Sequence, residues 1–176
     1  MDYARAHEVI LEELRKAVAG VPGEKVSALV ALLRAAPVVF VTGEGRSGLI
    51  ARCFAMRLVH LGIAAHVVGG TTTPALGTGD LLLAVSGSGE TDLTRTVARL
   101  ASAEGGRVAI VTGREDSPLA AAADLAVVIP TEGSAQYGRS LFEQSALIVL
   151  DAIAMQLQQE IERTSEQMDA RHANLE

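Results

Sequence analysis

The chain has little cysteine and few aromatic residues. Cys53 is the single cysteine among 176 residues, tryptophan is absent, and aromatic residues make up 3% of the sequence. One cysteine excludes an internal disulfide and disfavours a metal site built from cysteine thiolates. The apolar share is nevertheless 49%, and it consists mainly of Ala, Val, Leu and Ile. Small and branched side chains of this kind favour a parallel sheet that helices cover on both faces.

Positive charge is also scarce. The chain has 15 Lys and Arg against 21 Asp and Glu, a net charge of −6, and no run of basic residues. Nucleic acid and anionic membrane surfaces are therefore poor partners, and any phosphate must be bound by a local site. Residues 1–20 carry too many charges for a signal peptide, and no uninterrupted apolar run approaches the ~20 residues of a membrane span. These absences predict a cytoplasmic protein.

A strand–helix alternation follows an N-terminal helical region at residues 1–36, in which a helix pattern over 4–35 is interrupted at 20–23. Five apolar runs of strand length lie at 38–42, 65–68, 81–85, 108–112 and 125–129. Helical patterns separate most of them, at 47–61, 90–104 and 116–123. The segment 69–80 has little helical pattern, so a loop is expected there. The pattern predicts a doubly wound, five-stranded parallel sheet over 37–130, with the flavodoxin-like strand order 2-1-3-4-5.

The last long helix is expected to start near Ser140 and to run to about residue 165, within a segment 138–165. Its polar positions form one narrow stripe, at Gln144, Asp151, Gln158 and Glu162. A helix with so little polar surface must be buried on most sides. In a chain of this size, that predicts burial against another subunit. The polar tail at 166–176 is expected to be loose, and the whole of 1–176 is expected to form one domain.

Two loops rich in serine and glycine follow the first and third strands. They are GEGRSG (43–48) and SGSGET (86–91), and each opens a helix. A helix N-terminus presents unpaired N–H groups and partial positive charge, which favours an anion. Strands 1 and 3 are neighbours in the predicted order, so both loops lie at the crevice where such sheets bind ligands. The candidate phosphate ligands are Gly45, Arg46, Ser47, Ser86, Ser88 and Thr91.

Other interpretations of these loops remain open. Neither loop is a P-loop, because both lack its lysine. GEGRSG matches the GxGxxG pattern of dinucleotide-binding folds, but no acidic residue occurs between Glu44 and Asp80 to bind a ribose. A dinucleotide is therefore disfavoured. The plainest alternative is a pair of ordinary strand-to-helix turns, with Ser88 as a helix N-cap.

Several motifs together resemble the SIS (sugar isomerase) family, and within it the 6-phospho-3-hexuloisomerases. They are GEGRSG, FAMRLVHLG (54–62), TTTPA (71–75), GDLLLAVSGSGET (79–91), SLFEQSALIVLDA (140–152) and RHANLE (171–176). The resemblance implies interconversion of 3-hexulose 6-phosphate and fructose 6-phosphate, a step of formaldehyde fixation through the ribulose monophosphate route. It also implies a homotetramer, no metal and no organic cofactor. SAQYGR (134–139) departs from the family pattern, which leaves the roles of Gln136 and Tyr137 open.

Moving a ketone from C3 to C2 requires a base and a group that handles the hydroxyl protons. Glu143 is the candidate base, because the resembled family uses a glutamate at this position. The competing interpretation is structural, since Ser140-x-x-Glu143 matches a helix capping box. Arg46 would balance the phosphate charge or contact a sugar hydroxyl, or else lie in solvent.

His60 is the second candidate catalytic residue, again through the resemblance. It follows Ser47 by 13 residues, a rise of roughly 20 Å on one helix, so it cannot reach a sugar bound at that helix's own start. A catalytic His60 would therefore serve a neighbouring subunit. The alternative is a histidine of the core or of an interface.

Two further functions remain as alternatives. One is an isomerase of another phosphosugar, such as a pentose or heptose phosphate, which would use the same loops. The other is a non-catalytic phosphosugar-binding regulator. The regulator is disfavoured because residues 1–36 contain no DNA-binding helix-turn-helix pattern and no basic segment.

Overall fold

The computed structural model describes residues 1–174 and contains one parallel sheet with the strand order β2-β1-β3-β4-β5. Its strands are β1 (Val39–Thr42), β2 (Ala65–Val67), β3 (Leu81–Ser86), β4 (Arg107–Thr112) and β5 (Leu125–Val128). Every neighbouring pair is parallel. The predicted doubly wound sheet and its strand order are therefore confirmed.

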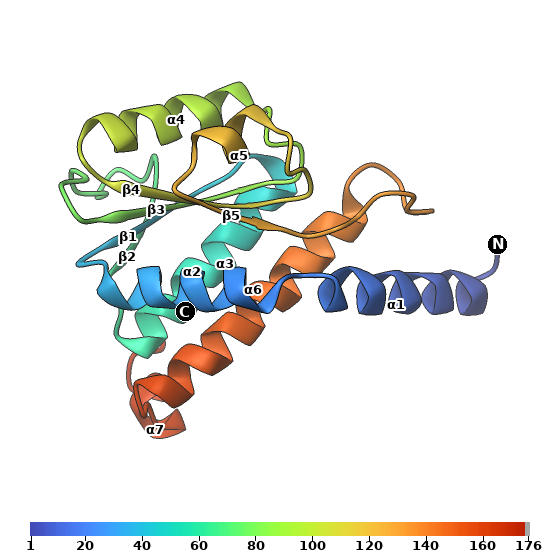
Figure 1. The fold of residues 1–176 in the computed structure, drawn as a ribbon. Helices are drawn as coiled ribbons and strands as arrows, with labels where there is room; N and C mark the ends of the chain where they lie inside the picture. Colours follow the sequence, from blue (N-terminus) through green and yellow to red (C-terminus); the bar gives the residue numbers. More distant parts are fainter. Residues whose placement is uncertain (175–176) are drawn as a thin grey trace.

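Helices cover both faces of this sheet (Figure 1). One layer consists of α4 (Asp92–Ala103) and α5 (Pro118–Ala122), and the other contains α2 (Gly23–Ala35), α3 (Gly45–Leu61) and α6 (Ser140–Glu160). Alternate residues of each strand point to opposite layers, so Leu82 joins the α4 side of the core and Leu83 joins the α3 side. Burial on both faces explains why the strands are continuous apolar runs.

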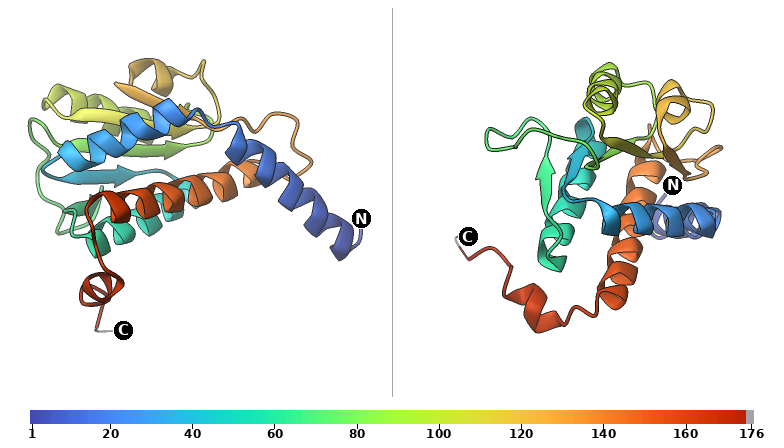
Figure 2. Two further views of the ribbon diagram at one scale, coloured as in Figure 1. Left: turned by 60° about the horizontal axis from the view of Figure 1, so that its bottom comes forward. Right: turned by 60° about the vertical axis from the view of Figure 1, so that its left-hand side comes forward.

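The first helix, α1 (Tyr3–Ala19), packs beside α6, and its N-terminal half projects past the sheet (Figure 2). Asp2 caps it by accepting a hydrogen bond from the N–H of Arg5 at 2.9 Å. The helix is interrupted between α1 and α2, as predicted. A Cβ on Gly20 would lie 2.6 Å from a side-chain carbon of Pro130, so this close contact requires glycine.

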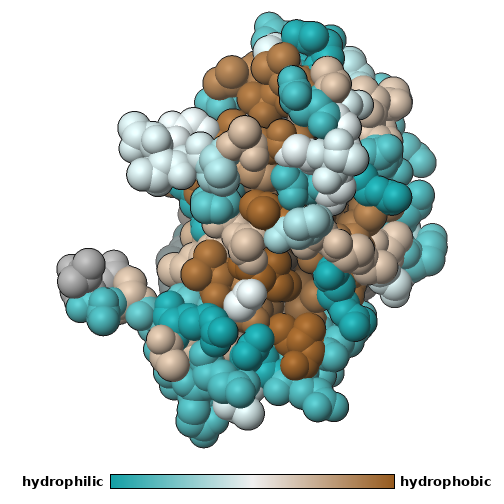
Figure 3. Space-filling view, turned by 90° about the vertical axis from the view of Figure 1, so that its left-hand side faces the viewer, coloured by the Kyte–Doolittle hydropathy of each residue, from teal (hydrophilic) through white to brown (hydrophobic). Residues whose placement is uncertain are grey.

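The crossover from β2 to β3 contains no helix, in agreement with the prediction. Asp80 fixes its end by accepting hydrogen bonds from the N–H groups of Gly77, at 2.8 Å, and Val38, at 3.2 Å. Figure 3 views the edge of the sheet where the strands begin, and apolar side chains gather there in patches between polar ones. The Ser/Gly loops lie at the opposite edge, where the strands end.

The C-terminal region corrects the predicted helix. α6 ends at Glu160 rather than near residue 165, Glu162 takes a positive φ of 53°, and a separate helix, α7 (Ser165–Asp169), follows. Thr164 and Gln167 form a capping box that gives α7 its own start. α7 contacts α3, and Met168 packs on the main core. The tail as far as residue 174 is thus partly helical instead of loose, and residues 175–176 lie outside the described chain.

α6 is long and apolar, in agreement with its narrow polar stripe. Over 18 residues its mean hydropathy is 1.3, so by length and composition it could cross a membrane. Half of that window is buried within the molecule, against neighbouring helices and the sheet. This packing accounts for the apolar character of the helix.

Candidate active site

The two Ser/Gly loops lie side by side at the edge where β1 and β3 end. Thr42 pairs in register with Ala84, which places the residues that follow the two strands next to each other. A Cβ on Gly43 would come within 2.7 Å of the carbonyl oxygen of Val85. The GEGRSG backbone therefore lies directly against the end of β3, immediately before SGSGET, and glycine permits this approach.

GEGRSG turns sharply into α3. Gly45 has a φ of +56°, and a Cβ on Gly48 would overlap the carbonyl oxygen of Gly43. Glu44 occupies the N-cap position but makes no capping hydrogen bond with its side chain. The first N–H groups of α3 consequently have no side-chain acceptor at the N-cap, and half-buried Ser47 lies in the same turn.

SGSGET is held by its own hydroxyl groups. Ser86 is buried; its Oγ accepts a hydrogen bond from the N–H of Gly89 at 3.2 Å and lies 3.4 Å from the hydroxyl of Thr91. The Oγ of Ser88 accepts from the N–H of Glu90 at 3.2 Å. Thr91, not Ser88, is the N-cap of α4, and its side chain makes no capping hydrogen bond. The interpretation of Ser88 as an N-cap is therefore wrong.

The one acidic residue within this loop, Glu90, has its charge compensated. Arg114 pairs with Glu90 at 2.9 Å and with Asp116 at 3.1 Å. An acidic side chain beside a phosphate would repel it, and this pairing reduces the repulsion.

Glu143 and Arg46 form an ion pair that joins α6 to the first turn of α3. The Glu143 side chain is 14% exposed, whereas that of Arg46 is 61% exposed. Arg139 occupies the N-cap position of α6, and the hydroxyl of Ser140 donates to the carbonyl oxygen of Tyr137 at 2.9 Å. The predicted capping box at Ser140 is therefore wrong, because α6 begins at Ser140 itself, one residue earlier than that motif requires. The Glu143 carboxylate is left to face Arg46.

The first turn of α6 also touches the SGSGET loop. Arg139 donates a hydrogen bond to the carbonyl oxygen of Gly87 at 3.4 Å, and a Cβ on Gly87 would lie 2.7 Å from the ring of Phe142. Three groups of predicted site residues thus meet here. They are Gly45 to Ser47, Ser86 to Thr91, and Glu143.

A cavity of about 320 Å³ opens beside GEGRSG, between the ends of β1 and β2 and the first turns of α3 and α4. Arg52 and Leu93 contribute to its wall, and sequence reasoning missed both. Arg52 follows Gly45 and Gly48 at the three- and four-residue spacing of one helix face. That spacing could have identified Arg52 as a lining residue.

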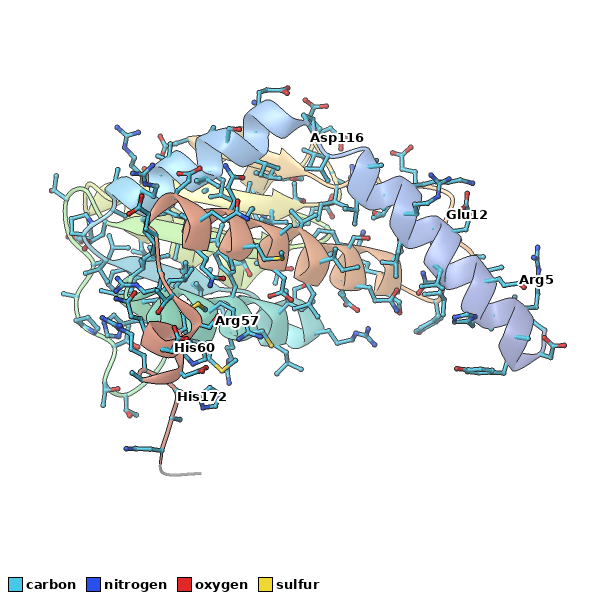
Figure 4. All side chains as sticks on the ribbon, turned by 90° about the horizontal axis from the view of Figure 1, so that it is seen from below. Arg5, Glu12, Arg57, His60, Asp116 and His172 are labelled. Carbon is cyan, nitrogen blue, oxygen red and sulfur yellow. The ribbon has the colours of Figure 1, made fainter. Side chains whose placement is uncertain are left out.

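His60 lies in the last turn of α3, away from this assembly. It is 5% exposed, and its ring stacks on that of His172 with centroids 5.0 Å apart (Figure 4). His60 and Gly45 are at opposite ends of one helix, which agrees with the expected separation from the loops. Burial lowers the pKa of His60 below its usual value, His172 and Arg57 lower it further, and Asp169 opposes them.

This environment predicts an acid-sensitive fold. Because the folded-state pKa of His60 is lowered, its contribution to stability is lost as pH falls below the unfolded value of about 6.5. Lowering the pH from 7.5 to 5.5 should therefore destabilise the wild type more steeply than His60→Gln, by up to about 1 kcal/mol per pH unit. Thermal unfolding at a series of pH values measures this difference. The exposed His7 provides a control, and His7→Gln should keep the wild-type slope. Identical slopes in all three proteins would contradict the prediction.

Comparisons with known proteins agree with this geometry. The SIS domain family matches residues 32–156. The chain is 43% identical over 176 residues to a 3-hexulose-6-phosphate isomerase of Mycobacterium gastri, covering 96% of this chain and 88% of that protein. It is 40% identical to a protein of the same name from Bacillus subtilis, with 95% of each chain covered. A crystal structure from Methanococcus jannaschii that infers the same molecular function superimposes with a TM-score of 0.88 at 31% identity, covering 98% of this chain and 99% of that one.

Proposed function

The chain belongs to the SIS domain family, and from that membership we propose that it interconverts 3-hexulose 6-phosphate and fructose 6-phosphate. The observation that carries the proposal is a largely buried carboxylate, Glu143, held beside two loops suited to a phosphate. Relatives with this activity match the chain over nearly its full length. The activity would serve formaldehyde fixation through the ribulose monophosphate route, in the cytoplasm, with residues 1–176 acting as one domain.

The phosphate is proposed to lie between the first turns of α3 and α4. The N–H groups there have no side-chain cap, so they are free to donate to phosphate oxygens. The hydroxyls of Ser47, Ser86, Ser88 and Thr91 would add donors, and Gly45 lets the backbone approach closely. Arg46 would supply the positive charge that the acidic chain as a whole lacks.

Glu143 is proposed to move the proton between carbons. Its carboxylate takes the proton from C2 of the 3-ketose, and electrons shift to give the 2,3-enediolate. The same group, now protonated, returns the proton to C3, while the hydroxyl proton passes from O2 to O3 and leaves the ketone at C2. Arg46 must first release Glu143, and phosphate or sugar oxygens compete for its guanidinium group. Arg46 can then stabilise the enediolate oxygen.

An assay of the purified protein tests this function against its alternatives. It should convert 3-hexulose 6-phosphate to fructose 6-phosphate in the presence of EDTA. Turnover of arabinose 5-phosphate or sedoheptulose 7-phosphate instead would identify an isomerase of another phosphosugar. Binding of fructose 6-phosphate without any turnover would identify a regulator.

We also propose a homo-oligomer, in particular a tetramer, whose sites are shared between subunits. α3 and α6 expose large apolar side chains to solvent, and Arg57 of α3 approaches Asp151 of α6 at 4.0 Å. An apolar surface on two packed helices favours contact with another copy. The exposed residues are Leu49, Met56, Val59, Leu147, Ile148 and Met155.

A shared site makes a prediction about mixed subunits. His60→Ala and Glu143→Gln proteins, each inactive alone, should regain activity when dissociated and reassembled together. Random pairing across a two-fold interface would restore up to about a quarter of wild-type activity. His60 must become accessible to the partner's sugar, which requires His172 to move from its ring. Mixed oligomers verified by mass spectrometry that stay inactive would count against a role for His60.

A further inference from the structure

Glu13 of α1 holds the loop that leads into α6. Its carboxylate accepts three hydrogen bonds, from the N–H of Ala135 at 2.7 Å, the hydroxyl of Ser134 at 2.9 Å and the side-chain amide of Gln136 at 3.0 Å. The Oγ of Ser134 in turn accepts from the N–H of Gln136 at 3.1 Å. One charged group thus fixes three consecutive residues that lie far from it in the sequence.

The segment held by Glu13 continues directly into the candidate active site. Three residues after Gln136, Arg139 donates to the carbonyl oxygen of Gly87 in the SGSGET loop. Phe142 packs against the same glycine, and Glu143 follows it on α6. The position of α6 relative to the phosphate loop therefore depends on where the 134–139 loop sits.

The same loop forms one wall of a second cavity, of about 380 Å³, which Arg46 also lines. Ala135, Gln136 and Tyr137 line it from the loop, and Ile10 lines it from α1. Arg46 is the partner of Glu143, so this wall faces one member of the ion pair. A shift of the loop would change the surroundings of both charged groups.

We propose that Glu13 is a positioning residue for the isomerisation, which fixes the 134–136 segment and thereby sets α6 and Glu143 against the SGSGET loop. This inference rests on the proposed function. It also explains the divergent SAQYGR segment: Ser134 and Gln136 provide two of the three donors that Glu13 binds. Glu13 is half-buried, and hydrogen bonds to an ionised acceptor are stronger than those between neutral groups.

The charge state of Glu13 agrees with this role. The N–H of Ala135 and the amide of Gln136 hold the pKa of Glu13 below its usual value, against the opposing effect of burial. The carboxylate is therefore ionised at neutral pH and can accept all three hydrogen bonds.

Replacement of Glu13 by Gln tests the inference. Ala135 donates to one carboxylate oxygen of Glu13, and Ser134 and Gln136 donate to the other. An amide keeps one of these acceptors and replaces the other with a donor, so at least one hydrogen bond is lost and the loop should loosen. Because a misplacement of about 1 Å can lower a rate about 100-fold, kcat/KM should fall 10- to 100-fold. The adjacent Glu12, which pairs with Arg15 and Lys16 on the exposed side of α1, provides the matched control. Glu12→Gln should keep wild-type kcat/KM.

Two readouts separate positioning from simple stability. The amide of Ala135 should exchange with solvent at least tenfold faster in Glu13→Gln than in Glu12→Gln. Ser134→Ala/Gln136→Leu should reproduce part of the loss in kcat/KM and add nothing further to Glu13→Gln. A Glu13→Gln protein that melts earlier but keeps wild-type kcat/KM at temperatures where it is folded would overturn the inference.

Failure of the proposed function would look different, because the wild type itself would not convert 3-hexulose 6-phosphate. Binding of inorganic phosphate would then decide the structural part of the inference. An affinity at least tenfold weaker in Glu13→Gln than in Glu12→Gln would uphold the link to the phosphate loop, and equal affinities would overturn it.

Discussion

Replacing Glu143 with Gln should lower kcat by about 10³-fold, because an amide of the same shape cannot take the proton from C2. The size of the effect reflects the usual contribution of a positioned general base. KM should change far less, since the phosphate loops are untouched. Initial rates over a range of substrate concentration give both constants. Thermal unfolding checks that the loss is chemical and that the variant remains folded, since the replacement also removes the ion pair with Arg46, whose side chain is exposed.

Glu160 is the matched control on the same helix. It lies at the far end of α6 and pairs with Arg34 at 2.8 Å, and solvent-exposed ion pairs of this kind contribute little to stability. Glu160→Gln should therefore keep wild-type kcat. If Glu143→Gln retained a tenth or more of the wild-type kcat, another group would have to be the base.

The second large effect is expected at Gly89, where substitution by Ala should disrupt the phosphate loop. Gly89 has a φ of +63°, and a Cβ there would overlap the Oγ and Cβ of Ser117. Ser117 cannot yield easily, because it is buried, donates to the carbonyl oxygen of Arg114 at 3.0 Å and caps α5. Strained backbone and overpacking together should lower the free energy of unfolding by about 3 kcal/mol or more. Calorimetry should also detect at least tenfold weaker binding of fructose 6-phosphate.

Gly23 provides the control for this change. It is the first residue of α2, and a Cβ there would meet nothing within 4 Å. Gly23→Ala should be neutral or stabilising by up to about 1 kcal/mol, because alanine reduces the freedom of the unfolded chain. Equal melting temperatures for Gly89→Ala and the wild type would show that the loop can rearrange.

The sheet could be predicted because its signals are local. Doubly buried strands are continuous apolar runs, and the doubly wound rule orders them once the ligand loops are recognised after strands 1 and 3. The C-terminal helices could not be separated in the same way. Apolar spacing continues through Leu157 and Ile161, and it masked the Thr164-x-x-Gln167 capping signal that starts α7.

The candidate site was predictable only where it is contiguous in sequence. The conformation of each Ser/Gly loop is specified within the loop itself, by a glycine with positive φ, Gly45 in one and Gly89 in the other. The Arg46–Glu143 pair and the contacts of Glu13 join segments that only the tertiary fold brings together. The start of α6 was predicted wrongly for the same reason. Ser140 matches a cap motif, yet the helix begins at Ser140 rather than after it.

The helix-free crossover between β2 and β3 is a segment whose sequence and length can change during evolution. It follows the edge strand β2, its end is secured by Asp80, and Leu76 packs on the α4 side of the core. We therefore expect changes of length between Gly70 and Ala75 to leave the sheet intact. Its beginning, at Val68 and Gly69, borders the cavity beside GEGRSG. New sugar specificities could therefore arise by altering this segment while the phosphate loops stay constant, with little loss of stability at each step.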